Sequence, residues 1–157
     1  MSTKVAAIAI VISLIISALL INAGSQGSIV VNGWPLFALC APIAFLLHWT
    51  FFIPSYILRT DHYFDLIGST SYVATAITAA MLSPSLDLRG IIICSMVVIW
   101  ATRLGLFLFT RIKQDGKDGR LDVIKTKFIL FLNLWTIGGL WVLVTMGAGL
   151  AAMTSKT

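Results

Sequence analysis

Charged residues are scarce in this 157-residue sequence: Asp, Glu, Lys and Arg make up 11% of it, and all six acids are Asp. Soluble domains carry roughly 25% charged residues. Hydrophobic residues reach 59%, whereas a soluble domain of about 150 residues still exposes roughly a third of its unfolded area. This apolar surface excludes a soluble globular protein, and the scarcity of charge excludes a disordered one. The solvent of the chain must be a lipid bilayer.

Cysteine is also scarce, and bases outnumber acids. Cys40 and Cys94 lie inside apolar runs, without the spacing of a metal site or a disulfide framework. They are most simply small hydrophobic residues. The formal net charge of +5 suits the cytoplasmic loops of a membrane protein better than nucleic-acid binding. We therefore expect neither a nucleic-acid partner nor a metal.

The apolar runs predict an all-α fold: a polytopic transmembrane helical bundle with about five spans, forming a single membrane domain over residues 1–157. A spanning helix needs about 20 residues. The expected spans cover residues 5–22, 34–58, 64–82, 91–110 and 128–153, and a hydrophilic cytoplasmic loop covers 111–127. The first run has the layout of a signal peptide. It is long and lacks a clear cleavage pattern, which favours a retained span.

The run at 64–82 differs from the other four because it is dense in small and hydroxylated residues, as in Gly68-Ser69-Thr70-Ser71-Tyr72. Such a helix gains little from lipid contact and much from close helix packing. We expect it in the middle of the bundle. In the second run, Pro42 and Pro54 each remove a backbone donor and should kink the helix.

The distribution of basic residues predicts the orientation. With five spans, Arg89 and Lys156 fall on one side of the membrane. Eight bases fall on the other side: Lys4, Arg59, Arg111, Lys113, Lys117, Arg120, Lys125 and Lys127. The positive-inside rule places this second side, and with it the N-terminus, in the cytoplasm.

Arg103 is the most informative single residue because a guanidinium inside a span costs at least about 2.5 kcal/mol on insertion scales. It lies eight residues before Arg111, or roughly 12 Å of helix, so its side chain can snorkel to the cytoplasmic surface. Alternatively it faces a wet, functional cavity, because Trp100, Phe107 and Arg111 share its face of the helix.

Asp65 lies at the cytoplasmic start of the third span, with Tyr72 two turns further on the same face. Its charge favours the helix dipole, or it pairs with Arg103 or Arg111, since the third and fourth spans are antiparallel neighbours. The candidate cavity or cofactor-binding residues are therefore Arg103, Asp65, Tyr72, Trp100 and Arg111. No catalytic residue is assigned.

Other polar residues favour ordinary structural roles. His48, in an apolar run, is more often a packed residue than a catalytic one. His62, near Asp61 and Asp65, suits an interfacial loop as well as a poor metal site. The carboxylates between Asp115 and Asp122 resemble a calcium loop, but each has a basic neighbour and the closing Glu is absent. A solvated loop is the better interpretation.

Several stretches together resemble the bacterial branch of the steroid 5-alpha-reductase-like membrane proteins. The similarity spans about residues 60–153 and includes the following stretches: Phe64-Asp65-Leu66-Ile67-Gly68-Ser69, Trp100-Ala101-Thr102-Arg103-Leu104-Gly105, Phe109-Thr110-Arg111-Ile112, Gly116 to Lys125 and Leu134-Trp135-Thr136. The resemblance implies a polytopic helical protein of a bacterial inner membrane. Characterised relatives reduce a carbon–carbon double bond in a lipid-like enone with NADPH.

The resemblance covers only the N-terminal half of such proteins, whose longer chains carry a nucleotide-binding region in the C-terminal half. Steroid reductases also use a Glu and a Tyr around the enone; this sequence has no Glu, and Trp100 stands three residues before Arg103. The resemblance therefore implies NADPH as the cofactor and a chain incomplete as an enzyme alone. A C-terminal half or partner helices would pack on a stripe of small residues: Gly138, Thr145, Gly149 and Ala152.

Two other function classes stay open. One is a non-catalytic membrane scaffold or lipid-binding bundle. The other is a small transporter, which would also account for an intramembrane Arg and a kinked second span. The absence of a detectable internal repeat makes a transporter the weakest of the three.

Overall fold

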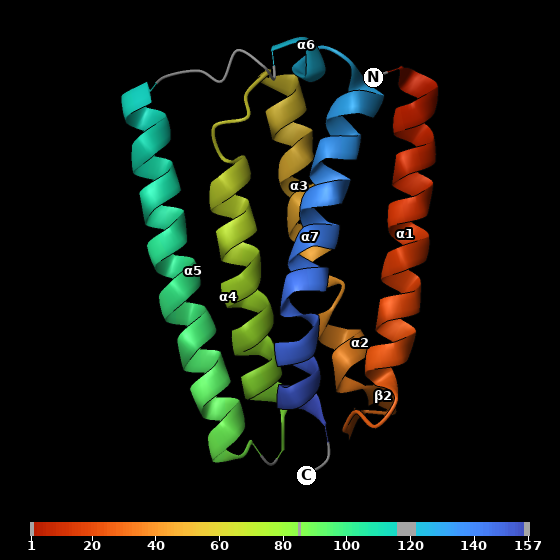
Figure 1. The fold of residues 1–157 in the computed structure, drawn as a ribbon, viewed down its shortest axis with the longest axis vertical. Helices are drawn as coiled ribbons and strands as arrows, with labels where there is room; N and C mark the ends of the chain where they lie inside the picture. Colours follow the sequence, from red (N-terminus) through yellow and green to blue (C-terminus); the bar gives the residue numbers. More distant parts are fainter. Residues whose placement is uncertain (1, 85, 116–121, 156–157) are drawn as a thin grey trace.

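The computed structural model describes residues 2–84, 86–115 and 122–155. Five long rods run up and down alternately (Figure 1). They are α1 (Thr3–Ser25), α2 with α3 (Leu36–Cys40 and Ile43–Ile57), α4 (Phe64–Leu82), α5 (Leu88–Asp115) and α7 (Phe128–Thr154). A short helix, α6 (Asp122–Lys125), precedes α7, and two short strands, β1 (Val30–Val31) and β2 (Trp34–Pro35), follow α1.

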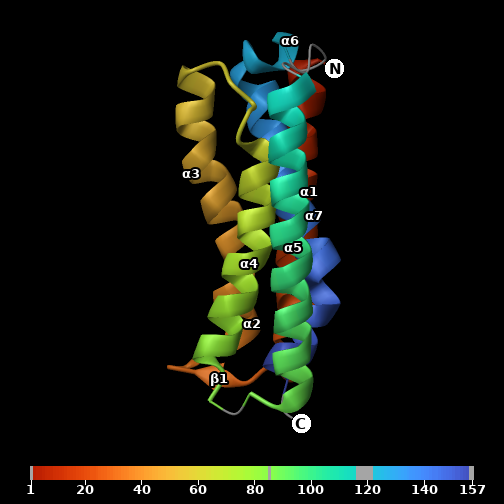
Figure 2. The ribbon, with the colours of Figure 1, turned by 90° about the vertical axis from the view of Figure 1, so that its left-hand side faces the viewer.

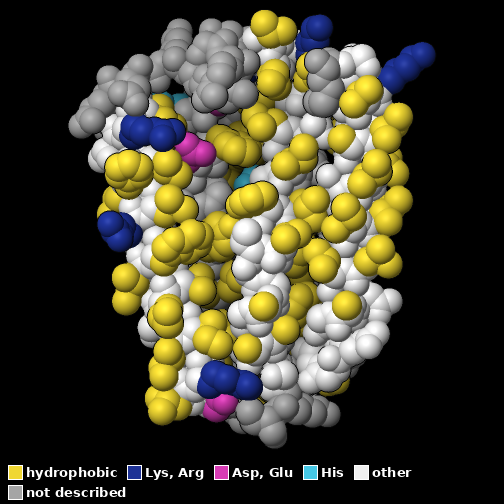
Figure 3. Space-filling model, viewed as in Figure 1, with side chains coloured by type: hydrophobic (Ala, Val, Ile, Leu, Met, Phe, Trp, Pro, Cys, Tyr) yellow, Lys and Arg dark blue, Asp and Glu magenta, His cyan; other side chains and the backbone are white. Residues whose placement is uncertain are grey.

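Four helical stretches within the described residues are long and apolar enough to cross a membrane: Thr3–Ser25, Leu36–Ile57, Leu88–Ile112 and Phe128–Thr154. The fifth rod, α4, is 19 residues long and is not among these four. The expected all-α membrane bundle is thus confirmed, with four helices of spanning character and α4 alongside them. In the space-filling view, hydrophobic side chains cover the long sides of the bundle (Figure 3).

Helix α4 lies in the middle of the bundle, as its small and hydroxylated residues predict. It packs against α2, α3, α5 and α7, and Figure 2 shows it between α3 on one side and α5 and α7 on the other. The approach to α5 is close because a Cβ at Gly105 would lie only 2.8 Å from Ser69 Cβ. Small residues therefore decide which helices α4 contacts.

The core lies between α2, α3, α4 and α7. Its largest fully buried side chains include Trp135, Phe131 and Leu36. Helix α1 packs against α7 and buries only Ala6, Ser13 and Ser17. Its bulky residues Ile8 and Leu19 are 59% and 64% exposed, which in a membrane directs them to lipid. A stripe of small residues is what brings two membrane helices together without a hydrophobic driving force between them.

The segments between the rods differ from expectation in two places. The connection after the first span contains a β-hairpin, in which Val30 pairs with Pro35 and Val31 with Trp34. Helix α5 extends beyond the expected 91–110 at both ends. Part of the expected loop 111–127 is helical, as α6. The calcium-loop-like segment falls mainly on residues 116–121, outside the described residues.

The proline residues have different effects. Pro42 separates α2 from α3, whereas Pro54 lies inside α3 close to its end. The two helices therefore form one apolar stretch, Leu36–Ile57, with an interruption at its lower third (Figure 1).

Candidate functional site

Tyr72 of α4 is the best-placed polar group among the candidate residues. Its side chain is buried, with 6% exposure, and its hydroxyl lies 2.5 Å from Thr145 Oγ1 of α7. The ring of Trp100 from α5 meets the Tyr72 ring edge to face, with centroids 5.0 Å apart. The structure thus brings Tyr72 and Trp100 together and adds Thr145, at the place where α4, α5 and α7 meet.

The direction of the Tyr72–Thr145 hydrogen bond follows from the other contacts of Thr145. The Thr145 hydroxyl donates to the carbonyl oxygen of Trp141 at 2.7 Å, on its own helix. Since a hydroxyl has one proton to donate, Thr145 accepts from Tyr72. The result is a chain from the Tyr72 hydroxyl through Thr145 to a backbone carbonyl, and such chains polarise their members cooperatively.

Arg103 and Arg111 are both exposed on α5. The expected pairing of Asp65 with Arg103 or Arg111 stays a prediction. Asp65 is half-buried in the first turn of α4, where a negative charge favours the helix dipole. In Figure 3 a basic and an acidic side chain lie close together near the upper end of α5. The five candidates therefore divide into Tyr72 and Trp100, whose rings are in contact, and three charged residues, Arg103, Arg111 and Asp65.

His48 is buried, as expected of a packed histidine, with 1% exposure. Its ring contacts Phe64 and Trp135 edge to face, at centroid distances of 6.1 and 6.0 Å. His62 packs instead against Tyr63 and Phe109. Among the residues that the structure describes, no three His, Cys, Asp or Glu side chains gather as metal ligands would.

An ion pair that the sequence interpretation missed lies at the α6 end of the bundle. Lys125 Nζ is 2.7 Å from Asp61 Oδ1, and the two side chains are 5% and 16% exposed. Arg59 donates to the carbonyl oxygen of Lys125 at 2.7 Å, and its guanidinium lies 4.5 Å from the centre of the Tyr56 ring. Asp61 and Lys125 occur in segments expected on the same side of the membrane. That common side is the sequence signal for their contact.

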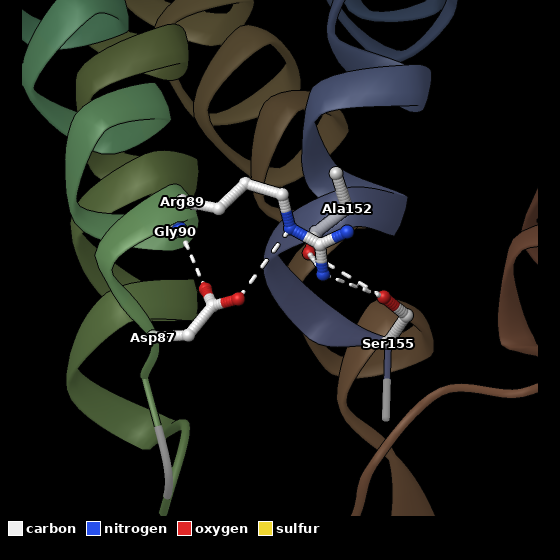
Figure 4. A network of polar contacts seen from close by, with 5 residues as sticks. All are labelled: Asp87, Arg89, Gly90, Ala152 and Ser155. Atoms are coloured by element: carbon white, nitrogen blue, oxygen red, sulfur yellow. Dashed lines mark hydrogen bonds and ion pairs between the residues drawn. The ribbon is translucent and has the colours of Figure 1, made fainter. Parts of the chain in front are cut away.

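A second polar network ties the opposite end of the bundle (Figure 4). Arg89 donates to the carbonyl oxygen of Ala152 at 3.1 Å and to Ser155 Oγ at 3.4 Å, and its Nε lies 3.5 Å from Asp87 Oδ2. Asp87 also accepts from the backbone N–H of Gly90 at 2.7 Å. A cation at the C-terminal end of α7 is favoured by the helix dipole, so this network is structural.

Other helices of the same chain contact part of the small-residue stripe of α7. Gly138 faces His48 of α3, Thr145 contacts Tyr72 of α4, and a Cβ at Gly149 would lie 3.5 Å from Ile93 of α5. Thr145 is nevertheless exposed, and the packing of a further helix on this stripe stays a prediction.

The bundle of apolar rods, with polar groups collected on its central helix, defines a polytopic helical membrane protein. Residues 51–157 match the family model described as "Protein of unknown function (DUF1295)". Since the match covers more than half of the chain, the protein belongs to that family. No curated protein and no solved structure matches the chain.

Proposed function

We propose that this chain forms the membrane-embedded wall of an NADPH-dependent enone-reductase-like protein, and that it is incomplete as an enzyme by itself. The observation that carries the proposal is the meeting of Tyr72, Trp100 and Thr145 between three helices. The sequence resemblance to steroid 5-alpha-reductase-like proteins supports the reaction type. The placement of the charged groups supports the cofactor.

The basic side chains of α5 fit the phosphate groups of NADPH. Arg103 and Arg111 follow Trp100 on the same helix, and both are exposed. A guanidinium is planar and always charged, and it binds phosphate oxygens through two parallel hydrogen bonds. Arg103 and Arg111 would hold the phosphates, and the bound cofactor would supply a hydride.

Tyr72 would be the proton donor that faces the substrate. A reductase of enones needs a donor for the carbonyl oxygen on which negative charge develops. In the present arrangement the Tyr72 proton is donated to Thr145. Rotation about the Tyr72 C–O bond would redirect it, while Thr145 keeps its hydrogen bond to the Trp141 carbonyl oxygen. The Trp100 ring, packed against Tyr72, would exclude water from this hydroxyl.

The proposal that the chain is incomplete as an enzyme rests on its acidic residues. Steroid reductases use a Glu beside the enone, and this sequence contains none. Asp65, the acid of the candidate set, lies two helical turns from Tyr72. We therefore assign the remaining part of the reaction site to residues outside 1–157, either of the same protein or of a partner.

NADPH titration of the chain in lipid nanodiscs, followed by energy transfer from protein tryptophan to the nicotinamide, tests the proposal. Residues 1–157 alone should bind weakly or not at all. Binding should appear when the nucleotide-binding region of a longer family member is supplied in trans. In that complex Arg103→Ala or Arg111→Ala should weaken binding at least about tenfold, or about 1.4 kcal/mol. Lys4→Ala, which removes an exposed base of α1, is the matched control and should have no effect.

Two results would contradict the proposal. Micromolar NADPH binding by residues 1–157 alone, lost in Arg103→Ala, would mean a compact and complete enzyme. Absence of binding in every combination, with the fold intact by circular dichroism, would favour the non-catalytic scaffold. The reading frame next to the gene is a cheaper indication, because a neighbouring nucleotide-binding region favours a reductase.

A further inference from the structure

We propose that His48 is the polar contact of a separate, lipid-facing ligand site. In this site the unprotonated Nε2 of the imidazole accepts a hydrogen bond from the hydroxyl of a membrane-dissolved amphiphile that enters between α4 and α7. The inference does not rest on the proposed reductase function. It uses none of Arg103, Arg111 or Tyr72.

The hydrogen bonds around His48 fix its tautomer. Nδ1 lies 2.7 Å from the carbonyl oxygen of Ala44, which can only accept. Ser71 Oγ lies 3.4 Å from the same nitrogen and donates its own proton to the Ile67 carbonyl oxygen at 2.7 Å. Both neighbours of Nδ1 are therefore acceptors, and Nδ1 carries the proton. In the neutral ring Nε2 is then left with a lone pair and no proton.

Nε2 has no hydrogen-bond partner among the residues that the structure describes. His48 as a whole is only 1% exposed. The ring edge that carries Nε2 faces Gly138 of α7. A Cβ at Gly138 would lie 2.8 Å from Nε2 and 2.8 Å from Cδ2, and 3.1 Å from Phe64 Cζ. Glycine is therefore required for this approach. An acceptor without a donor is unfavourable in apolar surroundings, so a donor from outside the chain would stabilise the site.

Helix α4 leaves open space one turn from Phe64, whose ring contacts the His48 ring. Gly68 lies one turn after Phe64, and a Cβ there would have no heavy atom within 4 Å. On the α7 side, Ile137 and Trp141 are 42% and 65% exposed. Figure 3 shows a small patch of histidine surface among hydrophobic side chains on the face that it displays. The unpartnered lone pair thus lies close to the lipid-facing surface rather than in a sealed interior.

The surroundings indicate the chemical class of the ligand. His48 belongs to the apolar stretch Leu36–Ile57, so the donor must be soluble in the bilayer. A hydroxyl can donate to Nε2, whereas an ether or a ketone cannot. A long-chain alcohol supplies both the donor and an apolar body that packs against Phe64 and Trp141.

Nitrogen-15 spectroscopy of His48 tests the site directly. The chain has two histidines, so His62→Asn leaves a single labelled imidazole in nanodiscs. Hexadecanol should move the Nε2 resonance saturably toward that of a hydrogen-bonded acceptor, while hexadecyl methyl ether should leave it in place. No shift with the alcohol, or equal shifts with both compounds, would overturn the proposal. An Nε2 already hydrogen-bonded in alcohol-free nanodiscs and unmoved by hexadecanol would mean that water is the partner, which also overturns it.

Photolabelling with a diazirine-bearing hexadecanol provides a second measurement. His48→Gln keeps a polar atom near the Nε2 position and should label like the wild type. His48→Asn keeps one near the Nδ1 position only, and labelling should fall about fivefold, the fold-change of one hydrogen bond. Gly138→Ala should displace the ring and abolish the shift, whereas Gly147→Ala, in open space on the same helix, should not. Equal labelling of the Gln and Asn variants, both folded by circular dichroism, would contradict the site.

Discussion

The substitutions Gly105→Ala and Ser69→Gly, made singly and together, should measure how closely α4 packs against α5. A Cβ at Gly105 would lie 2.8 Å from Ser69 Cβ and 3.1 Å from its Oγ. Ordinary contacts between carbon atoms begin at about 3.5 Å, so Gly105→Ala must push the two helices apart by roughly 0.7 Å at this crossing. The neighbouring contact of Ala101, which is fully buried, would loosen with it.

The expected free-energy changes follow from this geometry. A radial gap of 0.5–1 Å loses about a quarter to a half of each dispersion contact, and overpacking of cores costs about 1–3 kcal/mol. Part of this is offset because Ala favours a helix over Gly by up to about 1 kcal/mol. We expect Gly105→Ala to destabilise by about 1–2 kcal/mol. Ser69→Gly alone should cost about 1 kcal/mol or less, because Ser69 Oγ is buried and has no partner in the described residues.

The double variant provides the decisive comparison. Gly105→Ala with Ser69→Gly removes the clash, so it should be about 1–2 kcal/mol more stable than the sum of the single changes. Equilibrium unfolding by sodium dodecyl sulfate in mixed micelles, followed by circular dichroism, measures all three. Gly147→Ala is the control, since its Cβ meets open space, and it should be neutral or slightly stabilising. Single changes that add within about 0.5 kcal/mol would refute the close α4–α5 approach.

Three further predictions concern other parts of the bundle. Asp61→Asn removes the carboxylate 2.7 Å from Lys125 Nζ and should destabilise by about 3 kcal/mol in the same unfolding assay; a change under 1 kcal/mol would mean that the pair is solvated. Tyr72→Phe should cost only about 0.6–1.5 kcal/mol in stability, so a much larger loss would show that the hydroxyl has further partners. Reporter fusions after residues 30, 62, 86, 118 and 157 should report the cytoplasm at 62 and 118 only, and a cytoplasmic signal at both 118 and 157 would exclude the five-pass orientation.

Local signals in the sequence were sufficient for features that hydropathy alone did not reveal. Asn32 and Gly33 have positive φ, 50° and 84°, which is the conformation that an Asn-Gly pair favours in a two-residue hairpin turn. Asp87 accepts from the N–H of Gly90, as a helix N-cap does, so α5 begins at Leu88 rather than at the first strongly apolar run. Both patterns stand in the sequence. The hydropathy of the apolar runs does not indicate either of them.

The rotation of α5 was harder to predict. The interpretation of Arg103 as a cavity residue used the face that it shares with Trp100, Phe107 and Arg111. The buried residues in the described part of this helix, however, are Gly90, Ala101 and Gly105, and these small residues mark the packing face. The positions of these small residues predict Trp100 at the edge of the interface and Arg103 beyond it. The structure places them so: Trp100 is 49% exposed yet contacts Tyr72, while Arg103 is exposed.

Hydropathy has a systematic limitation in this fold, because it identifies helices that lipid covers and overlooks a helix that protein covers. Helix α4 is not among the four stretches that meet the spanning criteria, and it packs against three of them. Helix α4 nevertheless buries Ser69, Ser71, Tyr72 and Thr75, because neighbouring helices supply the packing that lipid cannot. Polar chemistry in a bundle of this kind is retained only where it is shielded from the bilayer. The least apolar helix is therefore the one from which a reaction site can be built, and Tyr72 of α4 is its best-placed group.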